Sequence, residues 1–160
     1  MKESPKQRDL RSSLEPGTLS GEGFLGTDKR SPAEIIQKDQ ETVESLGLTH
    51  AVIARRMRDL TEAGKAGLGR PVVVDGALEV TVEDARGAIA CPFKDRAFTA
   101  KQVTEVVHTK TGQSLRWSDL NIHLIEAHGF YEGEGAPFRI DPATLIRLIE
   151  VPSKDRPQET

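Results

Sequence analysis

The sequence is short of the residues that most often reveal a chemistry. Its 160 residues include one cysteine, Cys91, and few aromatics: five Phe, one Trp and one Tyr. A lone cysteine excludes an internal disulfide and a zinc knuckle of several cysteines, and it fits a reducing compartment. Because aromatics are scarce, the core must be built from Ile, Val and Leu.

Long hydrophobic runs are missing as well. No stretch of about 18 apolar residues occurs, which is the length that a membrane-spanning helix requires, and residues 1–28 carry no apolar signal core. We therefore expect no membrane partner and, by default, a cytoplasmic protein. The net charge of −3 argues against coating of nucleic acid through bulk charge, but it leaves room for a local basic patch.

Polar segments flank the part of the chain that can fold. Residues 1–27 are rich in Ser, Pro, Gly and charged residues and are expected to form a disordered arm. Residues 152–160 are expected to be a flexible tail for the same reason. Residues 28–151 suit a single α+β domain, with sub-units at 31–91 and 98–150.

Capping signals predict most of the helices. Ser31-Pro32-Ala33-Glu34 is a capping box with proline at the first helical position. Thr49 begins a second helix that Gly64 ends. Ser118 caps a helix over Asp119 to His128, and Asp141-Pro142 begins a last one.

A further helix is predicted after Phe98. Thr99-Ala100-Lys101-Gln102 has the form of a capping box, and Val103, Val106 and Val107 follow at helical spacing.

Strands are predicted where apolar residues alternate or follow a turn. Residues 72–74 and 78–82 flank Asp75-Gly76, the dipeptide typical of a type I′ hairpin turn. Short strands are also expected at 88–91 and 137–140. The sequence therefore predicts an α+β fold with two helix–helix–strand units around a small antiparallel sheet.

An internal repeat accompanies these two units. Residues 67–75 and 133–141 both read G-x-G-x-P-apolar-x-apolar-D. The match suggests a duplication. Convergence is the alternative, because Gly, Pro and Asp are common wherever a loop meets a strand.

The helix after Thr49, with the hairpin that follows it, resembles part of the winged-helix (helix-turn-helix) regulators. The resemblance covers residues 31–83, where an arginine-rich helix ending in Ala-Gly precedes a hairpin in the position of the wing. It implies a recognition helix in the major groove of nucleic acid. The residues that would make the contacts are Thr49, His50, Arg55, Arg56, Arg58, Lys65 and Arg70.

The same basic residues have a simpler interpretation. Arg55 lies four residues before Asp59, and Arg58 lies four residues before Glu62, on one helix face. Such pairs stabilise a solvated helix surface without any partner.

A polar stripe on the predicted helix 119–128 suggests a metal site. Asp119, His123 and Glu126 follow one line of the helix, and His108 is the nearest candidate in the sequence for a ligand from outside this helix. Two carboxylates and an imidazole can hold a metal or tune a general base. The alternative is the solvent-facing side of a packed helix.

Aromatics gather around the same helix: Trp117, Phe130, Tyr131 and Phe138. They suit either a local core or an interface with a peptide or a second copy of the chain, as in a homodimer. Cys91, beside Pro92 in an apolar stretch, is expected to be a buried strand residue rather than a nucleophile.

Together these patterns favour a non-enzymatic binding or regulatory protein without a cofactor, whose partner is nucleic acid or a protein. A small enzyme or metal protein that uses the Asp119, His123 and Glu126 stripe is the first alternative. A protein–protein interaction module that uses the aromatics near 130–138 is the second.

Overall fold

The computed structural model describes residues 4–15 and 23–152. The elements in chain order are α1 Pro5–Leu14, α2 Pro32–Ser45, α3 His50–Lys65, β1 Val72–Val74, β2 Leu78–Ala90, β3 Phe98–His108, β4 Ser114–Ser118, α4 Asp119–His128 and α5 Pro142–Leu148. The fold is thus α+β. No helix within the described ranges is long and apolar enough to cross a bilayer.

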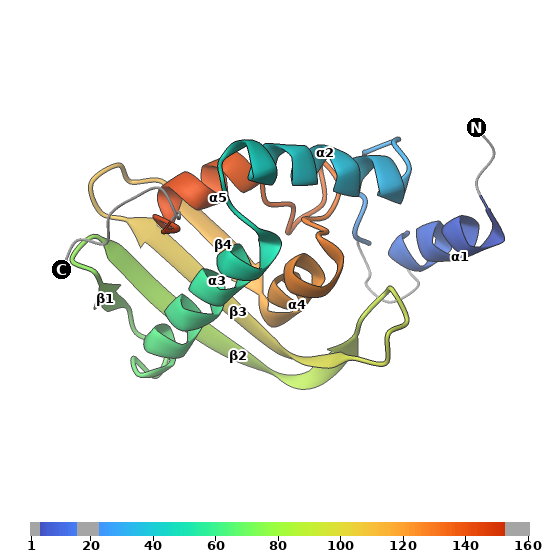
Figure 1. The fold of residues 1–160 in the computed structure, drawn as a ribbon. Helices are drawn as coiled ribbons and strands as arrows, with labels where there is room; N and C mark the ends of the chain where they lie inside the picture. Colours follow the sequence, from blue (N-terminus) through green and yellow to red (C-terminus); the bar gives the residue numbers. More distant parts are fainter. Residues whose placement is uncertain (1–3, 16–22, 153–160) are drawn as a thin grey trace.

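The four strands form one antiparallel meander in the order β1-β2-β3-β4. Figure 1 shows α3 and α4 packed on one face of the sheet, with α5 beside β4 and α2 packed on α5. The other face of the sheet carries none of the helices in the described part of the chain. β2 and β3 continue past the helices as a two-stranded ribbon, and the loop 91–97 at its end turns back toward α1 and α4.

Two clusters of buried residues make up the core. The larger lies between the sheet, α3 and α5 and includes Met57, Leu60, Val80, Val106 and Trp117. The smaller joins α1, α2, α4 and the loop 91–97. It includes Leu14, Phe24, Ile35, Cys91 and Leu124. Cys91 is therefore buried as expected, although it follows the last residue of β2 instead of lying in a strand.

The capping signals correctly located four helices. Ser31, Thr49, Ser118 and Asp141 each accept a hydrogen bond from the backbone amide three residues later. These bonds satisfy amides that would otherwise be unpaired in the first turn. The hairpin turn is also confirmed, because Asp75 and Gly76 have φ values of 53° and 73°, as a type I′ turn requires.

The helix predicted after Phe98 is wrong, because this segment is β3. Its buried residues are Gln102, Thr104, Val106 and His108, which alternate with more exposed neighbours. Burial that alternates with every second residue is typical of a strand, in which alternate side chains point to the covered face of the sheet. The segment is also rich in the β-branched residues Val and Thr, which favour strands.

The strand predicted at 137–140 is wrong as well. Turns bring Ala136 N to Gly133 O and Arg139 N to Ala136 O, at 3.1 Å each, so the segment leads into α5 as a coil. The two halves of the chain therefore differ: helices precede strands in the first, and strands precede helices in the second. Neither the duplication nor the winged-helix arrangement is confirmed, since the hairpin is the edge of a four-stranded sheet.

The described part of the predicted arm is packed against the body of the protein. Pro5–Leu14 is a helix, and the side chains of Leu14 and Phe24 are buried. The Phe24 amide donates to Leu14 O at 2.7 Å, and the Gly133 amide donates to Phe24 O at 2.8 Å. Residues 1–3 and 16–22 of the arm, and 153–160 of the tail, lie outside the described residues.

Candidate metal centre

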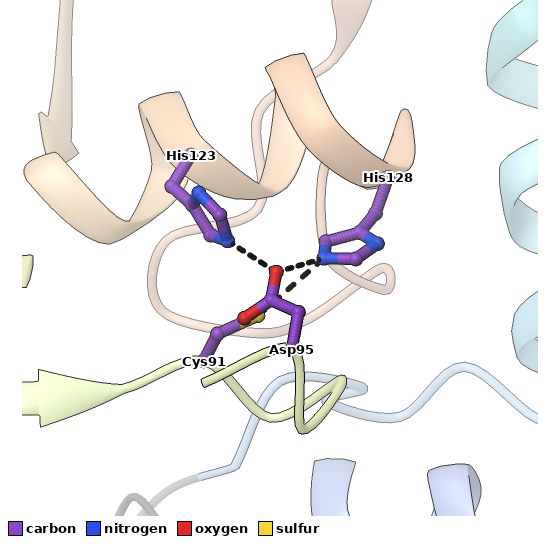
Figure 2. A group of neighbouring side chains, drawn as sticks. All are labelled: Cys91, Asp95, His123 and His128. Carbon is purple, nitrogen blue, oxygen red and sulfur yellow. Dashed lines mark hydrogen bonds and ion pairs between the residues drawn. The ribbon is translucent and has the colours of Figure 1, made fainter. Parts of the chain in front are cut away.

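Four side chains with metal-binding atoms converge at the end of the β2–β3 ribbon. They are Cys91, Asp95, His123 and His128, and their donor atoms all lie within 4.8 Å of one another. Figure 2 shows both imidazoles of α4 pointing toward the Asp95 carboxylate, with the Cys91 sulfur beside it. The Nε2 atoms of His123 and His128 are each 2.7 Å from Oδ2 of Asp95, and Sγ of Cys91 is 3.6 Å from Nε2 of His128.

The loop 91–97 holds Asp95 in place through local hydrogen bonds. The Cys91 amide donates to Ala97 O at 2.9 Å, and the Ala97 amide donates to Oδ1 of Asp95 at 3.0 Å. Lys94 and Arg96, on either side of Asp95, have φ values of 58° and 69°, a conformation that is strained for residues other than Gly. With Oδ1 engaged by Ala97, Oδ2 is the oxygen that meets the two histidines.

The last turn and a half of α4 supplies the histidines. The helix ends at Gly129, whose φ of 63° is left-handed, and this fixes the turn that carries His128. The ring of Phe93 stacks on His128, with 4.0 Å between centroids and an angle of 7° between planes. Phe93 also meets Phe130 edge to face at 5.5 Å, so the imidazole is held between the loop and the core.

The electrostatics of the cluster suit a cation. Burial by itself would raise the pKa of Asp95, but hydrogen bonds from the Ala97 amide, His128 and His123 outweigh it and hold the pKa well below its usual range. Asp95 is therefore a carboxylate at neutral pH. Burial raises the pKa of the Cys91 thiol to about 11, so it keeps its proton until a cation replaces that proton.

Of the four residues predicted to bind a metal, the three of the stripe and His108, only His123 belongs to this cluster. Glu126 pairs with Arg58 at 3.0 Å, and His108 lies 3.3 Å from Glu150. Asp119 accepts from Nε2 of Gln102 at 3.2 and 3.3 Å, and burial raises its pKa. Asp119 and Glu126 do line a cavity of about 280 Å³ together with His123. Among the described residues, however, neither they nor His108 belong to the group of donor atoms close enough to hold a metal with His123.

The sequence did contain a signal for the observed cluster. Cys91-x3-Asp95 and His123-x4-His128 have the spacings typical of two-ligand motifs in structural zinc sites. The aspartate in place of a second cysteine hides the pattern. His128 also lies off the line that joins Asp119 and His123, so a search for one helix face omits it.

The residues predicted to contact nucleic acid lie mostly in contacts within the chain. Thr49 caps α3, and Nδ1 of His50 is 2.9 Å from the hydroxyl of Tyr131. Arg56 donates to Ile149 O and to Asp75, and Lys65 pairs with Glu62. Arg58 pairs with Glu126, as above, while Arg55 and Arg70 are exposed. Acidic partners thus offset much of the positive charge, and nucleic-acid binding stays a prediction.

The aromatics predicted to form an interface lie mainly in the core. Trp117, Phe130 and Tyr131 are fully buried within the chain. Phe138 is half-buried, and the guanidinium of Arg116 lies over its ring, 4.7 Å from the centroid. Among these four, therefore, the structure leaves only Phe138 partly open to a partner.

Comparisons with known proteins add no relative from which a function could be carried over. No protein-family model, curated protein or solved structure matches the chain. Function is therefore inferred from the geometry of the described residues.

Proposed function

We propose that this protein binds one zinc ion through Cys91, Asp95, His123 and His128. The observation that carries the proposal is the convergence of a thiol, a carboxylate and two imidazoles from separate parts of the chain within 4.8 Å. In a tetrahedral zinc site with bonds of about 2.0–2.3 Å, neighbouring donor atoms lie about 3.3–3.8 Å apart. Movements of about 1 Å would bring the present donors to those separations.

The donor set favours zinc over the common hard cations. Thiolate and imidazole ligands suit zinc and other late transition metals, whereas Mg²⁺ and Ca²⁺ take oxygen ligands. The thiolate, the carboxylate and two neutral imidazoles together carry two negative charges, which neutralise a divalent ion. Four protein ligands also fill a tetrahedral shell, as in structural rather than catalytic sites.

The role that follows is a metal cross-link between the loop 91–97 and α4, added to the apolar packing that already joins them. Asp95 and Cys91 belong to the loop at the tip of the ribbon, and the histidines belong to α4 (Figure 2). A metal that binds the folded protein but not the unfolded chain stabilises the fold. A bound zinc ion departs from the expectation of no cofactor. A structural role for that ion agrees with the expectation of a non-enzymatic protein, which remains a proposal.

The direct test is metal content together with cobalt substitution. We expect purified protein to contain one zinc per chain, and Co²⁺ to give the intense visible bands of tetrahedral coordination and a near-ultraviolet thiolate band. Cys91→Ser should remove the thiolate band, and His128→Ala should reduce the metal content severalfold. His108→Ala is the matched control, because it removes a buried histidine that lies outside the cluster.

The alternative is a cluster held by hydrogen bonds alone, in which the imidazole N–H groups donate to Asp95. In that case no metal would be present at stoichiometric amounts, chelators would leave the melting temperature unchanged, and Co²⁺ would keep its weak octahedral spectrum. That set of results would overturn the proposal. Equal metal loss in His108→Ala and His128→Ala would also do so.

A further inference from the structure

A second site is indicated by a cavity of about 240 Å³ that none of the four metal ligands lines. It lies between the ribbon, the start of α4 and the segment 132–138. Its walls are mainly apolar, with contributions from Phe24, Ile89, Val103, Leu120 and Phe138. An engineered apolar cavity of about 150 Å³ is large enough to hold benzene, so a ligand of one ring and a short substituent fits this volume.

Glu132 is the buried ionisable residue in the wall of this cavity, and it is 4 % exposed. Its Oε2 accepts a hydrogen bond of 2.7 Å from Nδ2 of Asn121, a neutral amide in the first turn of α4. The backbone at Glu132 has a φ of 66°, which is strained for a glutamate. Strain of this kind persists where the surroundings fix the residue, and it is concentrated at functional sites.

The backbone around Glu132 is fixed from both sides. Its carbonyl accepts from Nη1 of Arg139 at 2.9 Å, and the next amide, of Gly133, donates to Phe24 O. The guanidinium of Arg139 is otherwise committed to Asp39, with Nη2 3.0 Å from Oδ1. In these contacts Arg139 therefore binds the backbone carbonyl of Glu132 and the carboxylate of Asp39, rather than the carboxylate of Glu132.

Apart from Lys101, the polar side-chain atoms that remain for a ligand in this cavity are acceptors. Nε2 of Gln102 donates to the Asp119 carboxylate, so the amide oxygen of Gln102 is the atom that can accept from a ligand. The Ser118 hydroxyl both donates to and accepts from Asn121. Lys101 also lines the cavity, but it is exposed, and its flexible side chain can keep its ammonium group in water. Burial, opposed by Asn121 and the charge of Arg139, raises the pKa of Glu132 to about 7, as expected for a carboxylate without a cationic partner.

From this arrangement we infer that the cavity binds a small molecule with an apolar body and a protonated amine, whose ammonium group pairs with Glu132. The apolar walls bury the body of the ligand, and the charged pair supplies orientation. The Gln102 amide oxygen is a second acceptor for the ammonium group. This second site is independent of the metal centre.

The test compares three probes of similar size: benzylamine, benzyl alcohol and benzoate. Each is titrated into the full chain at pH 8, where Glu132 is mostly ionised and benzylamine is mostly protonated. The shifts of the Phe24 and Gly133 amide signals are followed by NMR. We expect benzylamine to bind about tenfold more tightly than benzyl alcohol, since a charge-assisted hydrogen bond is worth about that factor. Benzoate should not bind.

The variant Glu132→Gln isolates the charge, because the side chain keeps its shape and still accepts from Asn121. We expect it to lose the preference for benzylamine while its affinity for benzyl alcohol changes less than twofold. Glu41→Gln, which removes an exposed carboxylate on α2, is the matched control and should behave like the parent.

A pH series on the parent protein gives a second test that needs no variant. Lowering the pH from 8 to 5.5 protonates Glu132, so the preference for benzylamine over benzyl alcohol should fall severalfold. The inference is overturned if benzylamine binds no better than the alcohol at pH 8, if none of the probes binds, or if the preference survives in Glu132→Gln or at pH 5.5.

Discussion

Glu132→Gln should change how the stability of this protein depends on pH. Burial raises the pKa of Glu132 from 4.5 to about 7 in the folded protein. The folded state therefore holds this proton more tightly than the unfolded chain does. The resulting stability is complete below pH 4.5 and is lost as the pH rises through about 7. Each pKa unit corresponds to about 1.4 kcal/mol, so the loss is of the order of 3 kcal/mol.

The Gln variant does not titrate, so it should escape this loss. The difference in free energy of unfolding between the variant and the parent should rise in favour of the variant by about 3 kcal/mol between pH 4.5 and pH 8. Other titrating groups, including the histidines, affect both proteins alike, and the difference removes them. Glu41→Gln should show a constant difference from the parent over the same range.

Urea unfolding followed by tryptophan fluorescence measures this quantity. Trp117 is the one tryptophan and is fully buried, so its emission should shift when the core opens. A chelator in every sample keeps metal binding out of the comparison. If the free energies of parent and variant run parallel from pH 4.5 to 8, the reasoning about the buried carboxyl is refuted.

Three further outcomes follow from the packing. Thr61→Val should lower the free energy of unfolding by about 1–3 kcal/mol. The reason is that Nε1 of Trp117 donates to Oγ1 of Thr61 at 3.0 Å and would be left unpaired. A cost no larger than that of an exposed Thr→Val change would contradict this. Leu14→Ala should cost about 2–5 kcal/mol in urea unfolding, because this side chain is fully buried. Leu10→Ala, half-buried on the same helix, should cost less, and equal small effects would mean that α1 does not dock. A chelator should lower the melting temperature of the parent by more than that of His128→Ala, and a parent whose melting temperature is the same with and without chelator would argue against a structural metal.

Local signals in the sequence were reliable where the interactions are themselves local. The caps at Ser31, Thr49 and Ser118 act on amides three residues away, and the Asp75-Gly76 turn closes between adjacent strands. Each of these depends on a few neighbouring residues and their φ values. Short stretches of sequence are therefore enough to locate α2, α3, α4 and the hairpin.

The segment that became β3 shows where local reading fails. Thr99 and Val103 fit a capping signal with helical spacing, yet residues 98–108 pair with β2 and β4 on both sides. Pairing of this kind stabilises a strand through partners that the segment itself does not specify. The buried Gln102 and Thr104 disguised the period of two, since both occupy covered positions normally taken by apolar residues.

The sequence by itself determined the α+β class, most helix boundaries and the ligand types that this chain can offer. Tertiary structure alone decided which of those ligands meet. Cys91 and His128 are 37 residues apart, and they come together because the ribbon turns its loop 91–97 back onto α4. Asp119 and Glu126 share a cavity with His123, but the same packing gives each of them another partner, Gln102 or Arg58. Spacing along one helix fixes only which side chains share a face, whereas a metal site needs donors from elements that only the folded chain brings within reach.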